Sequence, residues 1–380
     1  MRKTSLLTYL LTLIFLVTGQ AMLVASCPCG CHCEHECTCS CLEGHECHCG
    51  MEAKNPGAGV YEEAAGGCCC GDHCNCLQEE GEGCCCGEHC HCPQYDNNFL
   101  WHNRYLRYPP IACDGCMWGE WLCEKPVLMR PFLADPRKVT YSAGWRFNDQ
   151  VLEKNVIDVS YADTCQLYRW YNVWPWCGQL QFEVEGALWA VFDPTHESSP
   201  LMNADYYVGF PLTYAIDNWS FRLRGYHISS HIGDEFLLNH PHFNRKNPSV
   251  ECLDFFISHE YTDLIRIYGG LGYILVQDDS FWVKPFYAAY GAELRLPLWR
   301  FYRCDQHLYG EPFFAMHFRY QPDFVRHVDQ TYVLGYEFAK TVGLRRALRF
   351  YMEYHDGYST EGQFSLYPTN YFAVRLTYGF

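Results

Sequence analysis

Large apolar residues alternate with small or polar ones along most of the chain after Val139, and the last eleven residues show this pattern most clearly. Strand side chains point alternately to two faces, so residues two apart share a face. The large apolar and aromatic face holds Phe372, Val374, Leu376, Tyr378 and Phe380. The other face holds Ala373, Arg375, Thr377 and Gly379. A closed barrel in lipid turns such an apolar face outward, whereas a soluble sandwich would turn it toward a core.

The same alternation predicts about twelve strands between Val139 and Phe380, an even number as in bacterial barrels. They are expected at residues 139–149, 156–174, 179–192, 204–214, 218–230, 251–260, 263–276, 282–296, 310–320, 330–340, 346–356 and 370–380. Charged side chains on the predicted lumen face are Glu183, Glu185, Arg222, Arg224, Glu293, Arg295, His317, Arg319, Arg349 and Glu353. We therefore predict an all-β fold, a transmembrane antiparallel β-barrel over residues 139–380.

The start of the chain carries an export signal. Arg2 and Lys3 precede an apolar run that is followed by small residues near Ala25, so residues 1–26 are predicted to be a signal peptide. Residues 24–27 also resemble a lipobox, in which case Cys27 would be acylated. The terminal Phe380 resembles the assembly signal of outer-membrane barrels. These features favour an outer-membrane location, with the lipid bilayer and the barrel assembly machinery as partners.

Composition agrees with this interpretation. Aromatic residues make up 17% of the chain, which suits the aromatic girdles of membrane barrels. The formal net charge of −16 argues against a nucleic-acid partner, because binding phosphate groups requires a basic surface.

A cysteine-rich arm is predicted over residues 27–92, where 19 of the 26 cysteines lie. A nine-residue pattern of the form CCCGxHCxC occurs twice, starting at Cys68 and again at Cys84. Large apolar side chains are almost absent, so this segment cannot fold around a core. In composition alone, the arm resembles the cysteine-rich envelope proteins of chlamydial-type bacteria.

Two chemistries would order the arm. An exported compartment is oxidising, which favours disulfides to distant cysteines or to other envelope proteins. Thiolates and imidazoles at this spacing also suit Zn²⁺ or Cu⁺. The candidate metal ligands are Cys68, Cys70, His73, Cys74, Cys76, Cys84, Cys86, His89, Cys90 and Cys92. The sequence leaves disulfide cross-linking and metal binding open, together with a mostly disordered tether.

Residues 93–138 form an aromatic, proline-punctuated segment without a clear period. We predict that this segment is an extension that packs at the periplasmic mouth of the barrel or plugs it.

One cluster of polar residues suggests catalysis. His227 and Ser229 lie two apart on a predicted strand, so both point to its lipid-facing side. A His-x-Ser pair at this place resembles outer-membrane phospholipase A and the lipid A deacylases. The resemblance implies that His227 activates Ser229 to attack a lipid ester, with Asn244 orienting the imidazole and Ca²⁺ as a conceivable cofactor. A second interpretation is a divalent-metal site in the adjoining loop, formed by His231, Asp234, Glu235, His240 and His242. A third is a polar external loop without chemistry.

Residues 139–380 as a whole, including the stretch from His227 to Phe236, resemble an uncharacterised family of outer-membrane β-barrels of chlamydia-like and other Gram-negative bacteria. That resemblance implies an outer-membrane location and assigns no activity. Our leading interpretation is a structural or pore-forming envelope protein with a periplasmic cysteine-rich arm. An outer-leaflet lipid esterase is the alternative.

Overall fold

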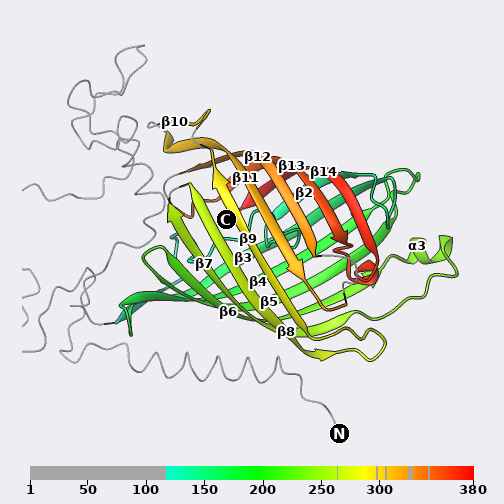
Figure 1. Ribbon diagram of the computed structural model, residues 1–380, viewed down its shortest axis with the longest axis horizontal. Coiled ribbons are helices and arrows are strands. Elements are labelled where there is room, and N and C mark those ends of the chain that lie inside the picture. Colours follow the sequence, from blue (N-terminus) through cyan, green and yellow to red (C-terminus); the bar gives the residue numbers. More distant parts are fainter. Residues whose placement is uncertain (1–116, 263, 297, 304–305, 324–327, 341–342) are drawn as a thin grey trace, which may run out of the picture.

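The computed structural model describes residues 117–380, apart from residues 263, 297, 304–305, 324–327 and 341–342. The predicted signal peptide, the cysteine-rich arm and its candidate metal ligands lie outside the described residues. Twelve strands form the wall of a closed barrel (Figure 1). They are β2 (Tyr141–Phe147), β3 (Asn155–Val173), β4 (Gly178–Phe192), β5 (Leu201–Ile216), β6 (Trp219–Ile232), β7 (Ser249–Thr262), β8 (Ile265–Gln277), β9 (Phe286–Arg295), β11 (Leu308–Tyr320), β12 (Asp329–Lys340), β13 (Ala347–Tyr358) and β14 (Pro368–Gly379).

The strands pair with their neighbours in an antiparallel register all the way around, and β14 closes the sheet on β2. The closing register runs from Phe372 opposite Phe147 to Tyr378 opposite Tyr141. Closure gives the wall strands partners on both sides, which a sheet in lipid requires because no water is available to its backbone groups. The predicted twelve-stranded antiparallel barrel is therefore confirmed, and most predicted strands lie within a few residues of the observed ones.

The remaining elements are short. β1 (Trp118–Trp121) pairs with β3 beyond the end of β2, and β10 (Phe301–Arg303) pairs with β11. A six-residue helix, α3 (Asp234–Asn239), and a single 3₁₀ turn, η4 (Gly362–Phe364), lie in loops at the same end of the barrel. No helix among the described residues has the length and apolar character of a membrane span.

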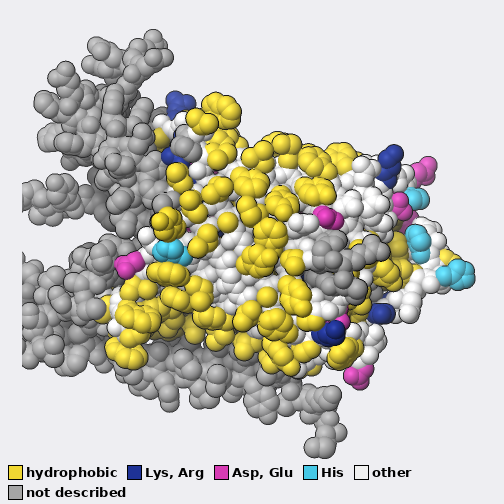
Figure 2. Space-filling view, viewed as in Figure 1, with side chains coloured by type: hydrophobic (Ala, Val, Ile, Leu, Met, Phe, Trp, Pro, Cys, Tyr) yellow, Lys and Arg dark blue, Asp and Glu magenta, His cyan; other side chains and the backbone are white. Residues whose placement is uncertain are grey.

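The two faces of the wall divide as the alternation predicts. On β13, Leu348, Phe350 and Met352 are 44–54% exposed, whereas Arg349 and Glu353 on the other face are buried in the lumen. Figure 2 shows apolar side chains covering the barrel wall, with charged and histidine side chains gathered at the end that carries α3. The barrel thus presents an apolar exterior and a charged interior, the reverse of a soluble protein.

The last residue departs from the expected pattern. Phe372, Val374, Leu376 and Tyr378 do point outward, but Phe380 is buried. β14 ends at Gly379, so the alternation does not continue to the final side chain. The guanidinium carbon of Arg346 lies over the ring of Phe380, 4.7 Å from the ring centroid.

Residues 122–140, called the plug below, run around the inside of the barrel. Leu128 packs against β5, Met129 and Phe132 form a cluster with β7, β8 and β9, and Leu133 forms one with β11, β12 and β13. Val139 then packs with residues of β3, β4 and β5, just before the chain enters β2. A single segment therefore contacts most of the wall strands from within the lumen.

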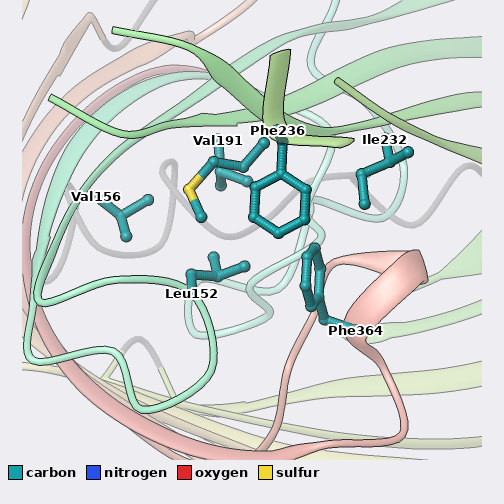
Figure 3. Close-up of a cluster of buried hydrophobic side chains, with 7 residues drawn as sticks. Leu152, Val156, Val191, Ile232, Phe236 and Phe364 are labelled. Atoms are coloured by element: carbon teal, nitrogen blue, oxygen red, sulfur yellow. The ribbon is translucent and has the colours of Figure 1, made fainter. Parts of the chain in front are cut away.

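Loops fold over the end of the barrel that carries α3. Leu152 from the β2–β3 connection, Phe236 of α3 and Phe364 of η4 meet residues of β4, β5 and β6 in one buried apolar cluster (Figure 3). The rings of Phe236 and Phe364 make an edge-to-face contact, with centroids 5.8 Å apart. This cluster holds three connections together and brings the β13–β14 loop inward, toward the plug.

Candidate functional site

The plug is fixed by polar contacts as well as by apolar ones. The amide of Leu133 donates to the Glu293 carboxylate at 2.9 Å, and the Arg266 guanidinium donates to the carbonyl oxygen of Arg130 at 2.8 Å. Arg266 also pairs with Glu293 at 3.1 Å. These groups are buried, so each hydrogen bond avoids the cost of a charged or polar group without a partner.

The plug meets the inward-folded β13–β14 loop at Arg137. The guanidinium donates to the carbonyl oxygen of Thr360 at 2.9 Å and to the carboxylate of Asp205 on β5. Glu361 pairs with Arg146 of β2 at 2.7 Å and lies 3.8 Å from Arg137. Burial alone would raise the pKa of Glu361, but the guanidiniums of Arg146 and Arg137 lower it to about 2. An ionised carboxylate therefore joins plug, loop and wall at neutral pH.

A chamber of about 240 Å³ lies between the plug and these loops. Asp135, Pro136 and Arg137 of the plug line it, together with Thr360 of the β13–β14 loop. Side chains of β4 to β9 and β11 to β13 form the wall. The side chain of Arg319, which lines the chamber, is 32% exposed.

Two arginine–aspartate pairs line the chamber. Arg224 on β6 and Asp254 on β7 are register partners, with a shortest nitrogen–oxygen distance of 2.6 Å. Arg319 on β11 and Asp329 on β12 are also register partners, again at 2.6 Å. Cross-strand pairing sets both contacts, because directly opposed side chains on one sheet face lie within reach of each other.

Aromatic rings cover the wall near the first pair. The rings of Trp189 and Tyr207 lie 5.5 Å apart, and those of Tyr207 and Tyr226 lie 5.6 Å apart. The hydroxyls of Tyr226 and Tyr287 are hydrogen-bonded at 2.8 Å, and the Tyr287 hydroxyl also donates to Asp254 at 3.4 Å. Alternation along the sequence predicts a lumen position for several of these charges. The chamber itself is not predictable in this way, because its lining comes from nine strands that only the closed register brings together.

The predicted catalytic pair lies on the outer face of β6. His227 and Ser229 are half-buried, whereas the next residue, Ser230, is buried in the lumen and donates to Asn203 at 2.9 Å. Within the described part of the chain, no hydrogen bond joins His227 to Ser229. The pair therefore shares one face without making the contact that activates a nucleophile.

The third predicted member, Asn244, is exposed in the loop between α3 and β7. The residue directly opposite His227 in the sheet is Glu251 of β7, and Ser249 stands opposite Ser229. Glu251 is not predictable from the sequence pattern, because a loop of this length does not fix the register between β6 and β7. A carboxylate opposite a histidine is the arrangement that orients imidazoles in hydrolases.

The loop metal site is not formed. Among the described residues, no group of three or more His, Cys, Asp or Glu side chains is arranged to hold a metal ion. The loop histidines turn to different neighbours: His231 contacts the ring of Tyr206, and His240 stacks on Phe236 with centroids 4.1 Å apart. Their imidazoles make separate ring contacts and do not converge on one point.

Comparison with known proteins identifies the family. The model of a family described as a protein of unknown function (DUF1207) matches residues 112–380. The chain belongs to this family. The match begins before the plug and continues to the last residue, so plug and barrel together make up the family's unit. No curated protein matches the chain.

Several solved structures are similar. Outer membrane phospholipase A from Escherichia coli is 11% identical with a TM-score of 0.45, and the match covers 64% of this chain and 92% of that one. LpxR from Salmonella typhimurium is 10% identical with a TM-score of 0.33, covering 63% and 100%. An anion-selective porin from Comamonas acidovorans is 10% identical with a TM-score of 0.30, covering 63% and 96%. A phospholipase and a porin are both among them, so this likeness does not choose between catalysis and permeation.

Proposed function

We propose that this protein is a structural component of the outer membrane, in which a plugged barrel anchors the cysteine-rich arm to the envelope. The observation that carries the proposal is the plug, because the segment leading from the arm into the barrel is packed against most of the wall from inside. Tension on the arm would therefore be carried by the whole barrel. In this proposal the arm lies in the periplasm and the loops around α3 face the outside.

The chemistry of the arm supports a linking role. Its cysteines cannot build a core, and adjacent cysteines pair poorly with each other because disulfide geometry is specific. Bonds to distant cysteines and to other envelope proteins would join the barrel to its surroundings. The barrel itself contributes few accessible thiols among its described residues, since Cys123 and Cys252 are buried and only Cys165 is exposed.

Native envelopes are expected to hold the protein as disulfide-linked oligomers. Electrophoresis without reductant should show high-mass species, and reduction should release the monomer. A variant lacking residues 27–92 should run as a monomer in both conditions, because the linking cysteines are gone. Cys165→Ser is the matched control, since it removes a thiol of the barrel and leaves the arm intact.

Two outcomes would contradict the cross-linking proposal. A monomer in unreduced wild-type envelopes is one. Several equivalents of bound Zn²⁺ or Cu⁺, with thiols that become reactive after chelation, is the other, and it would assign metal binding to the arm.

A second candidate function, an outer-leaflet lipid esterase, is favoured by the outer face of β6 and β7. His227, Ser229 and Glu251 lie on neighbouring strands, on the side that faces lipid, next to the loops around α3. We propose Ser229 as nucleophile, His227 as its base, and Glu251 or Asn244 as the group that orients the imidazole.

Ester cleavage is expected to be lost in Ser229→Ala and in His227→Ala, each tested as purified barrel in phospholipid–detergent micelles with Ca²⁺. Nucleophile and base act as a unit, so the double variant should lose little more than either single one. Ser230→Ala is the control, because Ser230 faces the lumen. Wild-type barrel that cleaves neither phospholipid nor lipid A would eliminate this candidate.

A further inference from the structure

The arginines that line the luminal chamber are already paired: Arg224 with Asp254, Arg319 with Asp329, and Arg137 with Asp205. The remaining aspartate of the lining, Asp135, accepts a hydrogen bond from the backbone amide of Arg137 at 2.9 Å. A charged ligand would have to take one member from such a pair and leave its partner without a counter-ion in a partly buried site, which is costly.

A hydroxylated ligand faces no such cost. Paired carboxylates retain lone pairs that accept from a hydroxyl, and a guanidinium has five N–H groups, of which one pair uses only some. A hydroxyl can donate to the first and accept from the second, so both pairs remain intact. Hydrogen bonds to charged groups are also stronger than those between neutral ones.

Aromatic rings lie beside these pairs. Trp189, Tyr207 and Tyr226 form a continuous run of rings over β4, β5 and β6. The Arg137 guanidinium lies 5.1 Å from the Trp189 ring centroid and the Arg224 guanidinium 5.0 Å from that of Tyr226, so the ring faces help to hold the paired arginines in place. The hydrogen-bonded hydroxyls of Tyr226 and Tyr287 stand at the edge of this run of rings, beside Asp254.

The volume of the chamber limits the size of the ligand. The volume of about 240 Å³ is below the roughly 300–1,000 Å³ of pockets that enclose drug-sized ligands. We propose that the chamber binds a neutral, polyhydroxylated molecule the size of a monosaccharide, held by the Arg224–Asp254 and Arg319–Asp329 pairs and by the hydroxyls of Tyr226 and Tyr287. This site is independent of the anchoring role and of the pair on the outer face of β6.

The proposal is tested by isothermal titration calorimetry on the full chain, purified in an amine-oxide detergent because glycoside detergents would compete. The probes are glucose, galactose and inositol, with glucuronate, glucosamine and glucose 6-phosphate as charged counterparts. At least one neutral probe should bind, and its charged counterparts should bind more weakly. The double variant Tyr226→Phe/Tyr287→Phe should weaken that binding on the order of tenfold, because it removes two hydroxyls without removing the rings.

Tyr351→Phe is the matched control. It removes a lumen hydroxyl from β13 that does not line the chamber, so affinity should stay unchanged. Heat-modifiable migration in electrophoresis confirms that each variant is folded. The proposal is overturned if no neutral probe binds, if a charged counterpart binds more tightly, or if Tyr351→Phe weakens binding as much as the double variant does.

Discussion

Replacing residues 124–137 by a glycine–serine linker of the same length is expected to convert a silent barrel into a conducting one. The plug contributes the apolar side chains that cluster with most of the wall strands, and Gly and Ser cannot replace those contacts. Without them, the charged lumen would hydrate. In planar bilayers, wild-type protein should give few or no openings. The variant should give discrete steps, smaller than those of the wider porins of about 16–18 strands.

A matched replacement of residues 50–63 within the cysteine-rich arm should remain silent, because it leaves the plug intact. A milder variant, Phe132→Ala, removes the ring that stacks on Tyr268 with centroids 3.7 Å apart, and it should give intermittent openings. Conductance of wild type equal to that of the linker variant would show that the plug does not close the lumen. That result would favour a pore-forming role over the anchoring role.

The strands were predictable because their signal is local. Period-two alternation marks each crossing from its own residues, which is why β13 and β14 appear almost where they were expected. The sequence pattern also placed Glu183, Arg222 and Glu293 on the lumen face, and all three are buried there. Alternation fails where a strand ends, as at Phe380, and where a bulge shifts the register, as between Gln166 and Tyr168 of β3.

The plug and the chamber depend on contacts between distant parts of the chain. Leu133 has no periodic partner nearby, and its neighbours Phe313 and Tyr351 lie on strands that follow much later. The approach of Arg137 to Thr360 likewise depends on how the β13–β14 loop folds inward. The prolines of this segment indicate that it is neither a helix nor a strand. They do not indicate which surface the segment will cover.

The outer face of β6 is a smaller example of a site that local sequence patterns predict only in part. The spacing of His227 and Ser229 was enough to put both on one side of a strand. The neighbour of His227 on the next strand depends on the register across a loop of sixteen residues that contains a helix. Glu251 takes that place, and it would have been found only by fixing the pairing of β6 with β7.

Arg375→Met is expected to lower the free energy of unfolding by about 3–5 kcal/mol, the usual effect of removing one partner from a buried ion pair. Arg375 is buried and binds two carboxylates, Asp158 of β3 at 2.9 Å and Glu353 of β13 at 2.8 Å. Methionine keeps much of the side-chain volume but leaves Glu353 without this guanidinium. Urea unfolding in lipid vesicles, followed by tryptophan fluorescence, measures the change.

The matched control is Arg346→Met. Arg346 pairs with Asp163 at 2.9 Å, but Asp163 is 37% exposed, and pairs open to solvent contribute only about 0–1 kcal/mol. The double variant Arg375→Met/Glu353→Gln should recover part of the lost stability, because it removes the uncompensated carboxylate as well as its partner. Equal losses for Arg375→Met and Arg346→Met would contradict the prediction. Such a result would mean that water reaches Glu353 in the folded barrel. The lumen would then be hydrated at the level of β13 and β14, although the packing around the plug indicates that the lumen is closed there.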